Sequence, residues 1–352
     1  MNGAAATRMR ELGMSLAFAA QVRAAARLGV ADALGDEPRT GAELAATVGA
    51  DPDTLDRLLR ALTSHGVFTA ATTEAATAAT AETAPAHYAH TELSRLLRED
   101  HPAGMRYIVL WATAPWTWQA WPRLDEAVRT GKPVFPEIYG QDFFAYLRDS
   151  DPESAEVFNR AMTQSSRITS DRVADALDLT GVDTVVDVGG GQGHLVDTLL
   201  RRHPRLRAVL FDLDPVVAGA VDGIRPGGPL AGRCRVVGGD CRVDVPSDAD
   251  LYVFKNVLEW DDDSTVAALR TVCRRGRPGG RVVLVQNLIE DSPERTVTTA
   301  MDLFLLLNVG GRKHTREGLT RLVAAAGLRP GGVEPVPGTS LHALTAHIPE
   351  VA

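Results

Sequence analysis

Two kinds of hydrophobic pattern divide the chain near its midpoint. In the N-terminal part, apolar residues recur every three or four positions, which is typical of amphipathic helices. We expect helices at 11–34, 41–48 and 51–64, and the last of these has Asp51 as a candidate N-cap. A short apolar run at 65–70 is typical of a strand. This order predicts a mainly helical, winged-helix-like domain.

The middle of the chain remains helical but becomes rich in aromatic residues. It follows an Ala- and Thr-rich stretch within 71–97, which predicts a mobile hairpin tip before another helix. Four of the five tryptophans then fall between residues 105 and 177. Together with neighbouring apolar side chains they predict an apolar, flat-sided cavity. The candidate pocket residues here are Trp111, Trp116, Phe144 and Met162.

The second half alternates strands with helices. Continuous apolar strands separated by helices predict a parallel sheet that is covered on both faces, in an α/β fold. Ligands of such sheets bind beyond the carboxyl ends of the strands. We therefore expect a dimerisation domain at 1–104, a helical linker at 105–177 and a ligand-binding domain at 178–352. The expected strands are 184–188, 207–212, 234–238, 251–254 and 281–289.

Charge argues against a nucleic-acid partner. The formal net charge is −8 and the isoelectric point is about 5.6, whereas phosphate contacts require clustered Lys and Arg. The would-be DNA-reading helix at 51–64 carries three aspartates against two arginines. A packing or dimerisation role for the N-terminal domain is therefore favoured over DNA binding.

The remaining composition points to a soluble cytoplasmic protein without a metal site. No apolar run approaches the roughly 20 residues that span a bilayer, so no membrane association is expected. The apolar run "LGMSLAFAA" resembles a signal peptide, but its pattern continues at helical spacing. The three cysteines form no metal-ligand or disulfide pattern.

The strongest local motif is "VVDVGGGQGHL". A buried strand ends at Asp187, and Gly189, Gly191 and Gly193 allow the backbone to turn tightly before the next helix. The dinucleotide motif G-x-G-x-x-G would require glycine at position 194, which is His194. The spacing instead resembles the first motif of class I S-adenosylmethionine-dependent methyltransferases.

Further residues extend this resemblance to the next strands. Asp212 ends the second strand, where a carboxylate can accept hydrogen bonds from a ribose diol. Asp240 and Cys241 follow the third strand, and in the resembled family these positions lie near the adenine. The resemblance implies a Rossmann-like domain with S-adenosyl-L-methionine as its cofactor.

Nearly the whole chain resembles plant-type small-molecule O-methyltransferases and their bacterial relatives in natural-product pathways. The resemblance rests on "FNRAM", "DVGGGQG", "FDL", "GD" and "NVGGRKHTREGL". It implies that Lys255 and Trp260 contact the adenosine part of the cofactor, and that Asn308 contributes to the acceptor pocket. It also implies a homodimer with interlocking N-terminal domains.

The loop after the fourth strand departs from the family pattern. The family usually has L-K-x-x-L-H-D-W there, with the histidine as proton acceptor, whereas this chain has "KNVLEW". Glu259 replaces either the histidine or its neighbouring aspartate, and the sequence does not decide between them. The candidate catalytic residues are therefore Glu259 and, in second place, His314, although methyl transfer by positioning alone requires no base.

The sequence thus predicts methyl transfer to a hydroxyl group of a small aromatic molecule. Methylation of carbon, on an aromatic or amino-acid-derived acceptor, stays open as an alternative. Cofactor binding without methyl transfer and a winged-helix regulator are the other two alternatives.

Overall fold

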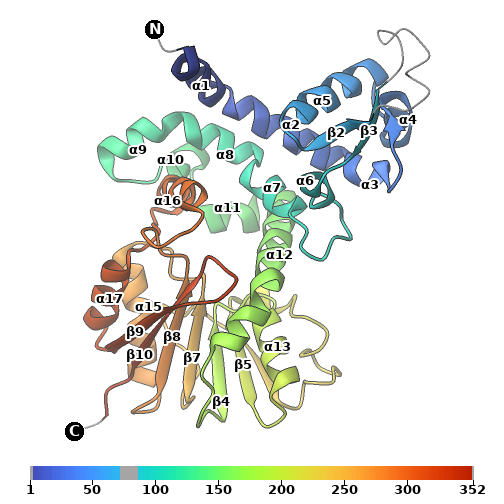
Figure 1. Cartoon of the computed structure of the whole chain (residues 1–352). Helices are drawn as coiled ribbons and strands as arrows, with labels where there is room; N and C mark the ends of the chain where they lie inside the picture. The colour runs from blue at the N-terminus through green and yellow to red at the C-terminus, as the bar shows by residue number, and fades with distance from the viewer. Residues whose placement is uncertain (1–2, 72–85, 351–352) are drawn as a thin grey trace. The chain divides into compact units, whose positions relative to one another are not determined.

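The computed structural model describes residues 3–71 and 86–350. The chain forms two compact units (Figure 1). Unit 1 comprises 1–118 and 152–164, and unit 2 comprises 119–151 and 165–352. The linker expected at 105–177 is distributed over both units, and the boundaries drawn from the sequence stay a prediction. Within the described residues, no helix is both long enough and apolar enough to cross a membrane.

Unit 1 combines short helices with a small sheet in the order β1-β3-β2. Side chains cap the start of three of its described helices, and Asp51 Oδ1 accepts a hydrogen bond from Thr54 N at 2.9 Å, as predicted. The helix expected at 11–34 is instead divided among three helices. The last division occurs at Gly29, which adopts a left-handed conformation (φ 69°) that ends α2. The predicted hairpin tip lies outside the described residues, between β2 and β3. The elements are α1 Gly3–Gly13, α2 Ser15–Leu28, α3 Val30–Leu34, β1 Arg39–Thr40, α4 Gly41–Val48, α5 Pro52–Ser64, β2 Phe68–Ala71, β3 His87–His90, α6 Glu92–Arg95 and α7 Arg106–Ala112.

Two helices contain the divisions between the units. These are α8 Pro115–Ala120 and the long helix α12 Pro152–Ala176. Between them, unit 2 contains a group of short helices whose apolar residues pack against a later helix, α16. The elements are the 3-10 helix η2 Trp121–Arg123, α9 Leu124–Thr130, α10 Phe135–Tyr139, α11 Phe143–Asp149 and α16 Arg295–Val309.

Unit 2 is built on a seven-stranded sheet in the order β6-β5-β4-β7-β8-β10-β9. The first five strands in this order are parallel, and β10 is antiparallel to both of its neighbours. The first three predicted strands match β4, β5 and β6, whereas β8 ends three residues earlier than predicted. Strands β9 and β10 were not predicted. The strands are β4 Thr184–Val188, β5 Arg207–Asp212, β6 Cys234–Gly238, β7 Leu251–Lys255, β8 Arg281–Gln286, β9 Arg329–Pro335 and β10 His342–His347.

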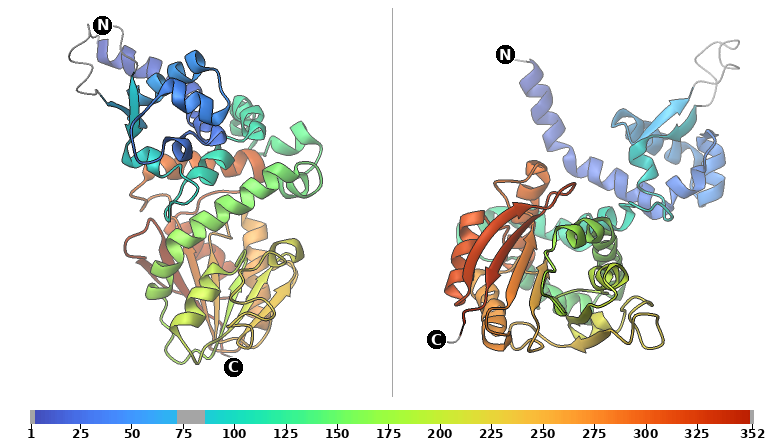
Figure 2. Two further views of the ribbon diagram at one scale, coloured as in Figure 1. Left: turned by 90° about the vertical axis from the view of Figure 1, so that its right-hand side faces the viewer. Right: turned by 60° about the horizontal axis from the view of Figure 1, so that its bottom comes forward.

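Alternate residues of each strand enter two hydrophobic clusters, one on each face of the sheet. Val186 and Val188 pack toward α15 and α17, whereas Val185 packs toward α13 and the end of α12. Figures 1 and 2 show these helices on opposite faces of the sheet. Both faces are buried, which explains the continuous apolar strands in the sequence. These elements and the short α14 have the bounds α13 His194–Arg202, α14 Asp214–Val217, α15 Asp262–Arg275 and α17 Arg316–Ala325.

The strand order creates a switch point at β4. Its successor β5 lies on one side of it and β7 on the other. The chain connections to β5 and to β7 therefore run to opposite sides of β4. Open α/β sheets bind ligands at such a switch point, beyond the carboxyl ends of the strands. The carboxyl ends of β4 to β7 bring together the candidate cofactor residues of the sequence analysis.

Candidate functional site

The glycine-rich loop after β4 has a distinct requirement at each of its three glycines. All three have positive φ angles, 68° at Gly189, 61° at Gly191 and 84° at Gly193. A Cβ atom on Gly189 would lie 2.5 Å from Val257 Cγ2, and one on Gly193 would lie 2.5 Å from Ile224 Cδ1. A Cβ atom on Gly191 would meet no atom within 4 Å. The loop is therefore packed at its ends and open at its centre, where a ligand can approach the backbone.

Asp212 holds this loop from the neighbouring strand. Its Oδ2 accepts a hydrogen bond from Gly191 N at 2.8 Å, and its Oδ1 accepts one from Leu213 N at 2.7 Å. Burial raises the pKa of the Asp212 carboxyl above its usual range. A carboxylate has about four lone-pair positions, so Asp212 retains acceptor capacity for the predicted ribose contact.

Asp187 lies at the floor of the same site, and it is 1% exposed. Neither of its carboxylate oxygens has a hydrogen-bond partner among the described residues. Burial raises the pKa of Asp187 to about 7, although the charge of Lys255 opposes this shift. Burial in turn lowers the pKa of Lys255. A buried carboxylate without a donor fits the ammonium group in the amino-acid part of S-adenosylmethionine, so these residues are compatible with the predicted cofactor.

The loop after β6 connects Asp240 with Trp260 through an arginine. Arg242 Nη2 donates a hydrogen bond to Asp240 Oδ2 at 2.7 Å, and this bond lowers the pKa of Asp240. The guanidinium carbon of Arg242 lies 5.6 Å from the ring centroid of Trp260, in a cation–π contact. Cys241 is buried in the hydrophobic core below this loop. Asp240 and Cys241 follow β6 and Trp260 follows β7, and the cation–π contact of Arg242 joins these two loops. The contacts of the three predicted residues with adenosine stay a prediction.

The two candidate catalytic residues lie on adjoining segments. The carboxylate of Glu259 forms an ion pair with the ammonium of Lys313. His314 Nε2 lies 2.8 Å from the carbonyl oxygen of Leu258, so this nitrogen carries a proton and donates it. Burial is the main cause that lowers the pKa of His314. The structure thus places both candidates beside the loop after β7, and their catalytic roles stay predictions.

The predicted acceptor-pocket residues are divided between the two units. In unit 1, Trp116 is buried, Met162 is exposed, and Trp111 lies edge-on to Phe158 with ring centroids 6.2 Å apart. The other two residues belong to unit 2 and are considered with the acceptor below. Pocket membership stays a prediction for all five residues, which are Trp111, Trp116, Phe144, Met162 and Asn308.

Sequence reasoning missed two charged residues of this site. Arg242 follows Asp240 by two positions, and its proximity in "GGDCR" was the available signal. Lys313 lies 54 residues after its partner Glu259, and no local pattern connects the two. The one signal in the sequence was that Lys313 directly precedes His314, which was already a candidate catalytic residue.

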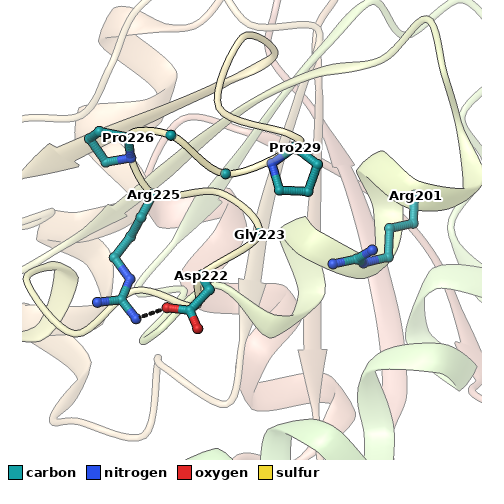
Figure 3. A pocket seen from close by; sticks show the side chains of 8 residues that line it. Arg201, Asp222, Gly223, Arg225, Pro226 and Pro229 are labelled. Carbon is teal, nitrogen blue, oxygen red and sulfur yellow. Dashed lines mark hydrogen bonds and ion pairs between the residues drawn. The ribbon is translucent and has the colours of Figure 1, made fainter.

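A cavity of about 580 Å³ lies elsewhere in unit 2, between the end of α13 and the loop at 222–229 (Figure 3). None of the predicted site residues lines it. Its arginines already have acidic partners, since Arg225 pairs with Asp222 and Arg201 pairs with Asp197 at 2.6 Å. The cavity therefore lacks the free charge that an anionic ligand would require. Among residues 3–71 and 86–350, no cluster of His, Cys, Asp or Glu is arranged to hold a metal ion.

Comparison with protein-family models identifies both parts of the chain. Residues 121–329 match an O-methyltransferase domain. Residues 12–100 match an O-methyltransferase dimerisation domain. The first match spans most of unit 2, including every candidate cofactor residue at the strand ends.

Individual relatives agree with these assignments. The chain is 36% identical to mitomycin biosynthesis 6-O-methyltransferase of Streptomyces lavendulae, over 90% of this chain and 88% of that protein. The solved structure of mitomycin 7-O-methyltransferase MmcR has a TM-score of 0.86 at 33% identity and covers 98% of both chains. The O-methyltransferase NcsB1, solved with S-adenosylmethionine and 2-hydroxy-5-methyl naphthoic acid, has a TM-score of 0.77 at 32% identity, over 94% of this chain and 95% of its own. The fold, enzyme class and cofactor predicted from the sequence are thereby confirmed, and the chain belongs to the O-methyltransferase family.

Proposed function

We propose that the protein methylates a hydroxyl group of a small aromatic natural product or its precursor, with S-adenosylmethionine as the methyl donor. The observation that carries this proposal is the strand-end site, in which an open glycine loop lies beside an unpaired buried carboxylate, within a chain that matches the O-methyltransferase domain. The relatives support the acceptor class, since one is a mitomycin 7-O-methyltransferase and another was solved with a hydroxynaphthoic acid.

The residues of unit 2 offer suitable surroundings for an aromatic acceptor. The rings of Trp121 and Phe304 lie 6.3 Å apart between the short helices and α16. Phe144 is exposed on α11. Asn308 is buried on α16, where its Oδ1 lacks a partner among the described residues. An aromatic molecule with a hydroxyl or amino donor would satisfy this oxygen while its ring packs on the aromatic side chains.

The reaction requires few groups from the protein. The sulfonium of the donor supplies an activated methyl group, so a lone pair of the acceptor oxygen forms the new C–O bond while the C–S bond breaks and its electrons remain on sulfur. The hydroxyl proton leaves to a nearby acceptor or to water. We propose that Glu259 contacts this hydroxyl, orients it and receives the proton, with His314 as the second candidate.

Incubation of candidate aromatics with isotopically labelled S-adenosylmethionine, followed by mass spectrometry, tests the proposed function. We expect a labelled methyl ether, which hydriodic acid cleaves. A label that resists this cleavage would show C-methylation instead. Binding of the cofactor without transfer to any acceptor would contradict the proposal.

Replacing Glu259 with glutamine is expected to lower the single-turnover methylation rate at least about tenfold, because glutamine cannot receive the proton. Cofactor affinity, measured by calorimetry, should remain within about twofold of the parental value. For His314→Ala we expect a smaller rate loss and a lower melting temperature, because the buried carbonyl of Leu258 would lose its donor. Near-parental rates in both variants would mean that positioning alone drives the reaction.

We also propose a homodimer assembled through unit 1. Residues 12–100 match the dimerisation domain, and four large apolar side chains on and between the first two helices are exposed, namely Met9, Leu12, Met14 and Leu16. A second copy would cover these side chains. We expect sedimentation equilibrium to give the mass of a dimer, and the double variant Leu12→Asp with Leu16→Asp to shift it toward the monomer. A parental mass of a single chain would contradict the proposal.

A further inference from the structure

The ion pair between Glu259 and Lys313 is nearly closed to water. The two side chains are 16% and 9% exposed, respectively. Charges withdrawn from water lose hydration, and their mutual attraction offsets this loss only when the geometry is favourable. A buried ion pair is therefore a poor source of stability, and its presence at a reaction site points to a role in fixing a charged group.

The segments that carry the pair are held together on both sides of it. His314 Nε2 donates to the carbonyl oxygen of Leu258 at 2.8 Å. Gly311 lies so close to the loop that a Cβ atom there would be 1.9 Å from the carbonyl oxygen of Glu259. Gly311 and His314, on either side of Lys313, thus contact Glu259 and Leu258, respectively. These contacts restrict the movement of the segment that carries the Glu259 carboxylate.

Lys313 is also tied to the acceptor side of unit 2. Its backbone N donates to Asp302 Oδ1 at 2.7 Å, and Asp302 belongs to α16. The same helix carries Asn308, with its unpaired buried oxygen. On the other side, Glu259 directly precedes Trp260, which lies under Arg242 at the cofactor side. The ion pair therefore joins α16 to the loop that borders the cofactor site.

We propose that Lys313 is a positioning residue for methyl transfer, which acts by holding the Glu259 carboxylate in place rather than by touching the reacting atoms. This inference rests on the proposed function. Displacement of the Glu259 side chain would leave the Lys313 ammonium buried without its counter-ion, so the pair keeps the carboxylate fixed. A displacement of about 1 Å in such a group can lower a rate on the order of a hundredfold.

Lys313→Met is expected to lower kcat at least about tenfold, whereas the KM for the acceptor and the Kd of S-adenosylmethionine change less than about threefold. Methionine retains the apolar length of lysine but removes its charge. Lys313→Arg, which preserves an ionic hydrogen bond to Glu259, should restore most of kcat. The matched control is Arg312→Met, because Arg312 pairs only loosely with Asp262, at 3.6 Å on the surface, and its kcat should remain parental.

The charge-exchanged double variant Glu259→Lys with Lys313→Glu distinguishes two roles of the ion pair. The pair could position the carboxylate, or it could only hold the two segments together. The double variant re-forms an ion pair, so its melting temperature should be higher than those of Glu259→Lys and Lys313→Glu alone. Its kcat should stay low, because the carboxylate then lies on the other segment. Recovery of kcat in this variant would overturn the inference, and so would a parental kcat in Lys313→Met. If Lys313→Met does not fold, Lys313→Arg and the double variant decide the question. Absence of methyl transfer by the parental protein would overturn the proposed function as well.

Discussion

Replacing Asp187 with asparagine should stabilise the ligand-free protein at pH 8 and weaken its binding of S-adenosylmethionine at least about a hundredfold. Both effects follow from the same observation, a buried carboxylate without a hydrogen-bond donor. In the ligand-free protein the ionisation of this carboxyl is unfavourable, whereas the ammonium group of the cofactor would compensate its charge. Chemical denaturation and calorimetry measure the two quantities separately.

The pH dependence of stability has a defined sign. The pKa of Asp187 is about 7 in the folded protein, above its ordinary value, because burial outweighs the charge of Lys255, and the charge of Asp212 adds to the effect of burial. Between about pH 4 and pH 7 the folded protein therefore retains a proton that the unfolded chain has lost. The contribution of Asp187 to the free energy of unfolding falls as the pH rises through this range and is constant above it. Its total is on the order of a few kcal/mol.

Cofactor binding should show the opposite trend. Because the ionised carboxylate binds the cofactor, affinity should rise between pH 6 and pH 8 in the parental protein, and this rise should disappear in Asp187→Asn. Asp250→Asn is the control, because the Asp250 side chain is 10% exposed at the amino edge of the sheet, where it pairs with Arg277 and accepts backbone hydrogen bonds from Asp183 and Thr184. It should lower stability and leave cofactor affinity unchanged. Parental affinity in Asp187→Asn would exclude the proposed contact.

Asp212→Ala should weaken cofactor binding by a similar factor. The predicted contact with a ribose diol consists of charge-assisted hydrogen bonds, and each contributes about 1.5–3 kcal/mol. Alanine also deprives Gly191 N and Leu213 N of their acceptor, so the glycine loop loses its support. Asp212→Asn, which retains one carbonyl acceptor, should fall between alanine and the parental protein.

Calorimetric titration with S-adenosylhomocysteine measures this effect without turnover. Asp222→Ala is a suitable control, because Asp222 is an exposed aspartate that pairs with Arg225 at the cavity of Figure 3. Its affinity should equal that of the parental protein. Unchanged affinity in Asp212→Ala would place the ribose contact elsewhere than at the end of β5.

Much of the cofactor site could be predicted from local sequence. Strands β4, β5 and β6 are apolar runs with distinct ends, and the residues that follow strand ends in a parallel sheet must lie at one edge. The glycine spacing after β4 is likewise local, since each of the three positive φ angles belongs to a single residue. The positions of Asp187, Asp212 and Lys255 at the ends of strands could therefore be predicted from the sequence alone.

The antiparallel strands β9 and β10 could not be predicted in the same way. The segment of β9 contains two prolines and two glycines, which usually mark turns, and its register is set by pairing with β10. Strand β10 is itself recognisable only through its pairing with β8, because its six residues mix polar and apolar types. Such pairing depends on tertiary contacts, and these override local propensity.

The sequence by itself determined the strands of the motif, the glycine loop and the acidic residues at the strand ends, because each depends on neighbours along the chain. Only the tertiary structure decided what surrounds those residues. Burial by residues from several elements leaves Asp187 without a partner, and the approach of two distant loops pairs Glu259 with Lys313. The physical reason is that hydration and ion pairing depend on distances in space, which the spacing of residues along a chain does not fix.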